Sequence, residues 1–431
     1  MLVVLPNFSL PAVAAARSKA LADWLDGFDV GWVVGGGTGE SLPLPRREVA
    51  RRVGAWAEAL HAMERVFRLH KPGLRVSEKE AAALGELVAA SAGAMLKLVR
   101  DISALKSSPS KLLVALDVYV PAWETYPVLA RLFSWAPSHP VLAAAEAALA
   151  DLVNAARVCC RRDLRAFVRA YYPWRMPPGD GEVIHPCVGF WMGYFRCMLR
   201  NRIPLYFILG NDGNPEDSRR AVSQPLLPAR AISAEGASGG GLSHLVAELI
   251  SCLEAVVEEK SSSSAAVPGL RQLFMLNNTC AIMLQAMGSD LRPFLPPEWL
   301  RVREERMEGY IKGYMDAAWA PVVSRLELDD GRASRPSIIV SRRRDPLHAF
   351  LSALEDACSE QRRWKVPNPV LRGIIRKVVT ESVVPMYRRF LQEHPEAHAV
   401  ATRLTAEELE HQLSNLFEEF VADELLMALV I

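Results

Sequence analysis

The sequence has 431 residues, of which 50% are hydrophobic, 23% are charged and 8% are aromatic. Such a chain can bury sizeable cores, which excludes a mainly disordered protein. The 50 Lys and Arg residues balance 49 Asp and Glu residues, and the net charge of +1 argues against a generally basic nucleic-acid-binding protein. At roughly 100–200 residues per domain, the length predicts two to four packing units.

Cysteine usage and hydropathy indicate the compartment. The seven cysteines are odd in number and include no Cys-x-x-Cys pair that could seed a zinc or redox site, which indicates a reducing compartment. The apolar stretch 1–15 has no positive charge before it and is interrupted by Pro6 and Pro11, which argues against a secretory signal. No stretch reaches the ~18–20 uninterrupted apolar residues of a membrane span. We therefore expect a cytoplasmic protein.

Apolar residues recur at spacings of three and four in long windows, whereas alternating, strand-like runs are almost absent. This pattern is typical of amphipathic helices. Short Pro or Gly breaks separate adjacent windows, which favours antiparallel neighbours. The sequence therefore predicts an all-α fold. In chain order, the first helical windows cover residues 47–69, 77–105, 111–133, 141–167 and 185–209.

Stretches rich in Gly, Pro and small polar residues interrupt the helical pattern and divide the chain. We interpret residues 1–45 as a poorly defined appended segment and 211–241 as a mobile loop. The predicted bundles cover residues 46–175, 176–325 and 340–431, the last with a basic face and an acidic, apolar tail.

Motifs for phosphate or zinc chemistry are incomplete. The glycine-rich run 35–39 lacks the Gly-Lys-Ser/Thr ending of a phosphate-binding loop, which favours a turn. His185-Pro186-Cys187 resembles the start of a zinc-deaminase signature, but its Glu and its Pro-Cys-x-x-Cys partner are missing, which favours an ordinary helix start.

Two further groups have a simple structural interpretation. Consecutive glutamates before His411 are typical of a helix start, where they complement the helix dipole, rather than of a metal site. Asn277-Asn278-Thr279 has the form of a glycosylation acceptor, but its place in an apolar helix argues against modification. We predict no catalytic, cofactor-binding or metal-ligating residue, and no enzymatic activity.

Charge segregates near the end of the chain. Positive side chains outnumber negative ones over residues 341–390, and the sign reverses over 391–431. A three-four stripe predicts the buried side of the helix over 371–384, so that its cations project from the other side. This basic face could dock on an anionic membrane surface, or its arginines could pair with the acidic tail. The predicted stripe consists of Leu371, Ile374, Ile375, Val378 and Val379, and the cations are Arg372, Arg376 and Lys377.

Several short sequence motifs resemble, in the same order along the chain, motifs of the seventy-kilodalton exocyst subunit family. Residues 273–278 resemble its FLMNN signature and 108–112 its SPEKLF segment. These motifs are closer in sequence to those of plant members of the family than to those of animal members. Further matching motifs lie at His185-Pro186 and residues 192–199, at 361–390 around Trp364-Lys365-Val366-Pro367, and at 409–418.

The resemblance implies an elongated rod of stacked antiparallel helical bundles that tethers secretory vesicles to the plasma membrane in exocytosis. It also implies a cytoplasmic protein, peripheral at that membrane, with other exocyst subunits, small GTPases and phosphoinositide-containing membrane as partners, and no nucleic acid. Basic residues near the C-terminal end would contact phosphoinositides. The implied lipid-binding residues are Arg342, Arg343, Arg344, Arg372, Arg376 and Lys377. The expected core anchors are Trp299, Tyr310, Trp319, Trp364 and Tyr387.

Departures from the family pattern favour an alternative. The long N-terminal region that joins the family's members to the complex is missing or replaced, and its K-E-R-F-K segment becomes residues 344–348, with fewer cations. The alternative is a specialised protein-interaction module that acts in plant immunity or signalling without joining the complex, with receptor kinases or pathogen effectors as partners. The apolar tail 420–431 could dock back on the bundle or mark a partner site.

Overall fold

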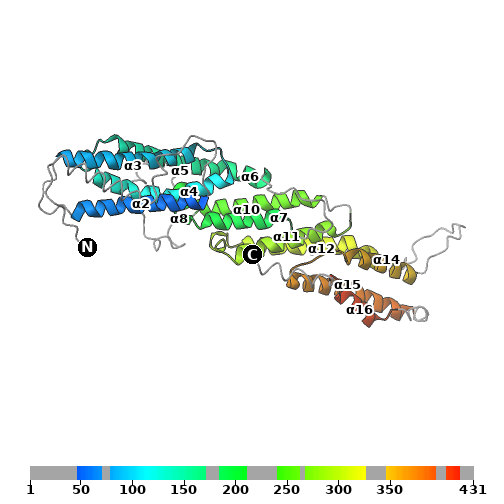
Figure 1. Ribbon diagram of the computed structural model, residues 1–431. Coiled ribbons are helices and arrows are strands. Elements are labelled where there is room, and N and C mark those ends of the chain that lie inside the picture. Colours follow the sequence, from blue (N-terminus) through cyan, green and yellow to red (C-terminus); the bar gives the residue numbers. More distant parts are fainter. Residues whose placement is uncertain are drawn as a thin grey trace. The chain divides into compact units, whose positions relative to one another are not determined.

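Every regular element in the described part of the chain is helical, so the predicted all-α class is confirmed (Figure 1). The computed structural model describes residues 46–69, 78–170, 184–210, 240–262, 267–326, 346–394 and 404–417. The interpretations given to residues 1–45, to 211–239 and to 418–431 lie outside these ranges. The chain divides into two compact units: unit 1 holds residues 1–171 and 194–249, and unit 2 holds 172–193 and 250–431. The three-bundle division stays a prediction.

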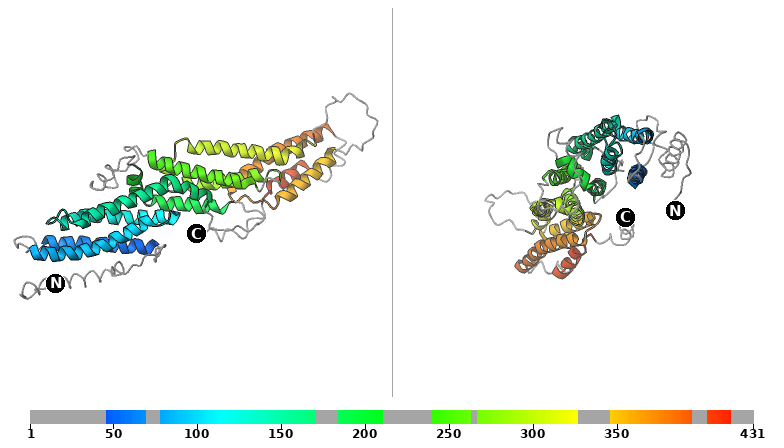
Figure 2. Two further views of the ribbon diagram at one scale, coloured as in Figure 1. Left: turned by 90° about the horizontal axis from the view of Figure 1, so that it is seen from above. Right: turned by 90° about the vertical axis from the view of Figure 1, so that its left-hand side faces the viewer.

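Long neighbouring helices form the body of unit 1 (Figure 2). Helix α2 packs on α4, while α5 packs on both α3 and α4. After α5, the π-helical turn η2 (Cys159–Asp163) leads into α6 (Leu164–Ala170). The bounds of the long helices are Arg46–Leu69 for α2, Glu78–Ala104 for α3, Pro109–Leu132 for α4 and Pro140–Val158 for α5.

The junction between α3 and α4 explains the motif at residues 108–112, one of those that resemble the family. The Ser108 hydroxyl caps α4 by accepting a hydrogen bond from the Lys111 backbone N–H at 3.1 Å. The Lys111 ammonium turns back and donates to the carbonyl oxygens of Ser103, at 2.7 Å, and Leu105, at 2.5 Å. These carbonyls end α3 and have no further helical turn to pair with. The motif at 108–112 therefore connects the end of α3 to the start of α4 through hydrogen bonds.

The single helix predicted over 185–209 is wrong, because the structure has two. Helix α7 (Pro186–Leu199) ends in a turn, and α8 (Arg202–Gly210) follows it and packs on α4 and α5. Pro204 gives the reason: it has no N–H to donate, and its ring would clash with the carbonyl four residues earlier in a continuous helix. In the first turn of α8 neither restriction matters.

Unit 2 is built from helices later in the chain. Within it, α11 packs on α12 and α15 packs on α16. A π-helical turn, η6 (Met315–Trp319), continues α12 into α13 (Ala320–Val323). The remaining bounds are Gly240–Ser261 for α10, which enters unit 2 at residue 250, Leu270–Met287 for α11, Trp299–Tyr314 for α12, Pro346–Gln361 for α14, Pro369–Glu393 for α15 and Ala406–Ser414 for α16.

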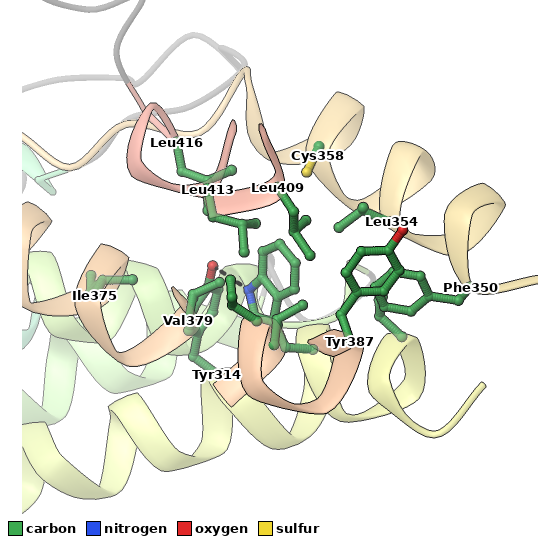
Figure 3. Packing of buried hydrophobic residues seen from close by; sticks show 14 of the residues in the cluster. Tyr314, Phe350, Leu354, Cys358, Ile375, Val379, Tyr387, Leu409, Leu413 and Leu416 are labelled. Atoms are coloured by element: carbon green, nitrogen blue, oxygen red, sulfur yellow. Dashed lines mark hydrogen bonds between the residues drawn. The ribbon is translucent and has the colours of Figure 1, made fainter. Parts of the chain in front are cut away.

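A buried aromatic group lies at the centre of unit 2 (Figure 3). The Trp319 indole N–H donates to the Tyr314 hydroxyl at 2.8 Å, and this hydroxyl donates to Gln361 Oε1 at 2.5 Å. The Phe350 and Tyr387 rings stack with centroids 5.3 Å apart. Leucines from α14 and α16 complete the packing around them. The polar atoms of the large rings are thus paired inside the core, as burial requires.

One glycine permits a close approach in this core. Gly269, just before α11, has a φ of +83°, a left-handed conformation that side chains other than glycine rarely adopt. A Cβ atom there would lie 2.9 Å from the Ala318 Cβ and 3.1 Å from Tyr314 Cδ2. The start of α11 can therefore contact η6 only with glycine at this position.

Four of the five expected anchors are buried. The exposed fraction is 3% for Trp299, 0% for Trp319 and Tyr387, and 8% for Trp364. Tyr310 is half-buried, and its side chain lines a surface cleft.

Candidate functional site

The two asparagines of the FLMNN-like motif connect α11 to two other segments of unit 2. The Asn277 side-chain amide donates to the Lys365 carbonyl at 2.9 Å, in the segment before α15. The neighbouring Asn278 Oδ1 accepts from the His185 backbone N–H at 2.7 Å, just before α7. Both asparagines are buried, at 4% and 0% exposed. Asn277 is thus enclosed in protein, in keeping with the expected absence of glycosylation.

His185 and the cysteines have the environments of structural residues. The His185 Nδ1 atom lies 2.9 Å from the Cys187 sulfur at the start of α7. Burial lowers the pKa of His185, and the positive Lys260 lowers it further. Burial raises the thiol pKa of Cys159 and Cys358 to about 11 each. Thiols with such pKa values are weak nucleophiles at neutral pH.

The described part of the chain has no group of three or more His, Cys, Asp or Glu side chains placed to hold a metal ion. Among the same residues, we find no helix whose length and apolar content would let it traverse a lipid bilayer. One of the glutamates before His411 has a local role: Glu408 forms a capping box with Thr405 at the start of α16, with bonds of 2.7 and 3.1 Å.

The six predicted lipid-binding residues differ in their surroundings. Arg342, Arg343 and Arg344 lie outside the described residues. Within α15, the Arg372 Nε donates to the Val366 carbonyl at 3.0 Å, and the Arg376 Nε donates to the Leu416 carbonyl at 2.6 Å. The Lys377 side chain is 73% exposed and has Glu381 3.7 Å away. Lys377 is therefore the most accessible of the three cations that are described.

The buried stripe of α15 is narrower than predicted. Leu371, Ile375 and Val379 are buried, but Ile374 is 45% exposed, so its placement in the stripe is wrong. Residues four apart lie nearly above one another, and the neighbouring elements cover only this strip. Val370 is 70% exposed. Spacing alone could not show which pair is buried, because 370 and 374 have the same spacing as 371 and 375, one position earlier.

Val370, Ile374 and Lys377 are four and three residues apart, which places them on one side of α15. We call these three residues the α15 face. Arg362 and Arg363 are exposed in the segment that leads to this helix. The α15 face thus combines apolar and cationic side chains, a combination that suits an amphipathic or anionic surface.

Pairing with the acidic tail occurs farther along α15. Arg388 contacts Glu410 of α16 at 3.1 Å, with Glu407 3.7 Å away. Arg389 pairs with Glu393 in its own helix at 2.7 Å. The later arginines of the helix are therefore paired with carboxylates, whereas the side chains of the α15 face are exposed, with Glu381 near Lys377.

Comparisons with known proteins give a consistent result. Residues 61–415 match the family model of the C-terminal part of the Exo70 exocyst complex component. The chain is 26% identical over 318 residues to the exocyst complex component EXO70B2 of Arabidopsis thaliana, covering 72% of this chain and 48% of that protein. It is 25% identical over 245 residues to EXO70E2 of the same plant, covering 56% of this chain and 35% of that protein.

A solved structure shares the fold. The crystal structure of the S. cerevisiae exocyst component Exo70p matches with a TM-score of 0.52 and 15% sequence identity, over 94% of this chain and 75% of that one. The chain spans about half the length of EXO70B2 and about a third of EXO70E2.

Proposed function

Because the chain belongs to the Exo70 family of exocyst subunits, we propose that it acts as a helical scaffold in the exocyst and helps to tether secretory vesicles to the plasma membrane. The observation that carries this proposal is the family match over residues 61–415, which includes every described helix of unit 2. Two of the segments that resemble the family fasten helical elements to one another: the one with Ser108 and Lys111, and the one with Asn277 and Asn278. Such an internal framework supports a scaffold role.

Co-purification with exocyst subunits tests this role. We expect the full chain, expressed with an affinity tag in plant cells, to recover other subunits of the complex, because a scaffold works through stable surfaces. Mass spectrometry of the eluate identifies them, and a tagged Trp319→Ala variant, whose core is disrupted, should recover few. Recovery of no subunit by a folded wild-type chain would contradict exocyst membership.

We propose further that the α15 face gives this scaffold a weak contact with phosphoinositide-containing membrane. Each cation near anionic headgroups contributes about 1 kcal/mol, and salt weakens the attraction. Lys377 on this face is exposed and supplies such a charge. Val370 and Ile374 add apolar surface, which is favoured at the headgroup boundary by roughly 25 cal/mol per Å² buried. The contact is modest, as suits a protein that must also be released.

Flotation with liposomes tests the α15 face. We expect Lys377→Glu combined with Ile374→Ser to reduce the fraction of protein that floats with phosphoinositide liposomes by about fivefold or more. Arg389→Glu is the matched control: it makes the same charge change on α15, away from the face, and should float like wild type. Equal losses in the two variants would show that overall charge, and not this face, attracts the membrane.

The exposed apolar pair Val370 and Ile374 also supports a second candidate function. In this alternative, the α15 face receives another protein, and the chain is a specialised interaction module in plant immunity or signalling. The co-purification experiment separates the two: a receptor kinase or pathogen effector in the eluate, without exocyst subunits, would favour the module.

A further inference from the structure

A small cleft in unit 2 opens between α10, α11 and α12. Its volume is about 130 Å³, enough for one side chain but not for a folded ligand. Buried Val257, Met275 and Ile282 supply an apolar floor. Polar side chains surround this floor: the carboxylate of Glu258 and the hydroxyl groups of Tyr310 and Thr279.

Thr279 is the residue whose surroundings point to a ligand. Its side chain lines the cleft and is only 6% exposed. Its hydroxyl forms no hydrogen bond with another described residue, and it is not among the polar atoms that are closed off from solvent, so it opens on the cleft. Thr125, the other buried threonine of the described core, shows the usual arrangement and donates to the Ala122 carbonyl at 2.7 Å. A group that enters the cleft would satisfy the Thr279 hydroxyl.

The charges of the cleft favour one cation. Glu254 also lines it, but this carboxylate is already held by Arg303, at 2.8 and 2.9 Å, and by Arg306, at 3.2 Å. The Glu258 carboxylate is exposed and forms no ion pair among the described residues. It raises the pKa of the Tyr310 phenol, after burial as the first cause, while the nearby Arg306 and Arg271 lower it. Tyr310 therefore stays protonated at neutral pH and can accept through its oxygen.

We propose that this cleft receives a lysine side chain from a protein partner. A lysine has an apolar stem that fits the floor and an ammonium head with three donors. The acceptors available to that head are Glu258, Tyr310 and Thr279. The Arg306 guanidinium at the edge would repel a second cation, so the cleft selects a single lysine in an otherwise uncharged segment.

Ligand-observed saturation-transfer NMR tests the proposal, with the full chain and the peptide acetyl-Gly-Lys-Gly-amide as probe. We expect transfer to the lysine ε-methylene protons and at least about fivefold less transfer to the Nε-acetylated twin, which has lost the charge. Glu258→Gln should reduce the signal similarly. Glu259→Gln is the matched control, because Glu259 is exposed next in the chain and does not line the cleft.

Thr279→Val separates binding from folding. It removes a hydroxyl that opens on the cleft and makes no hydrogen bond with another described residue, so the melting temperature should stay about the same, while the peptide signal should fall. Equal signals for the lysine and acetyl-lysine peptides, or equal losses in Glu258→Gln and Glu259→Gln, would overturn the proposal. These outcomes do not depend on exocyst membership or on membrane binding.

Discussion

Replacing Glu254 with alanine should lower the free energy of unfolding of unit 2 by about 3–5 kcal/mol. The Glu254 carboxylate is 11% exposed and accepts two hydrogen bonds from Arg303, whose side chain is 8% exposed. The Arg303 guanidinium also lies over the Trp299 ring, 4.3 Å from its centre. Without the carboxylate, this guanidinium remains buried among apolar groups with no counter-charge, which is the costly state of a broken buried pair.

Urea denaturation followed by circular dichroism measures this loss. Glu305→Ala is the matched control, because Glu305 pairs with Arg301 on the surface of α12, where both side chains are more than half exposed. An exposed pair of this kind contributes about 1 kcal/mol or less. Similar losses in the two variants would show that Arg303 finds another partner or that water reaches it.

Trp319→Ala should destabilise unit 2 by about 3–5 kcal/mol, as expected for a large aromatic side chain in a closed core. Trp319 is fully buried, and the cavity would form between the segments that pack around it. The change also removes the donor to the Tyr314 hydroxyl. Thermal unfolding gives the comparison with Trp135→Ala: Trp135 is 47% exposed, so its loss should cost about 1 kcal/mol or less. Equal costs would contradict the closed packing around Trp319.

The sequence predicted the helices well because each depends on local periodicity. The boundary of α4 at Pro109 and that of α15 at Pro369 follow the helix-start rules for proline. The division between α7 and α8 was also present in the sequence, in Pro204, but the apolar periodicity continues across this proline and hides the break. Proline alone does not decide a boundary, because Pro121 and Pro127 lie inside α4 and Pro385 lies inside α15.

The candidate site was only partly predictable, because it depends on contacts between distant residues. Periodicity placed Arg376 on the side of α15 opposite the core, but it could not show that the Leu416 carbonyl, 40 residues later, receives its hydrogen bond. In the same way, nothing near Thr279 indicates that α10 and α12 leave a cleft beside it. Both features arise from helix packing, which a single chain's pattern does not specify.

The two neighbouring asparagines of α11 have a mechanical consequence. Successive residues of an α-helix point about 100° apart, so Asn277 and Asn278 grip two different segments from one turn. A pull on the segment at His185 and a pull on the segment at Lys365 therefore load the same turn of α11. Under tension, this turn would bear both loads. A rotation of α11, or its translation along the helix axis, would break the hydrogen bonds to both segments.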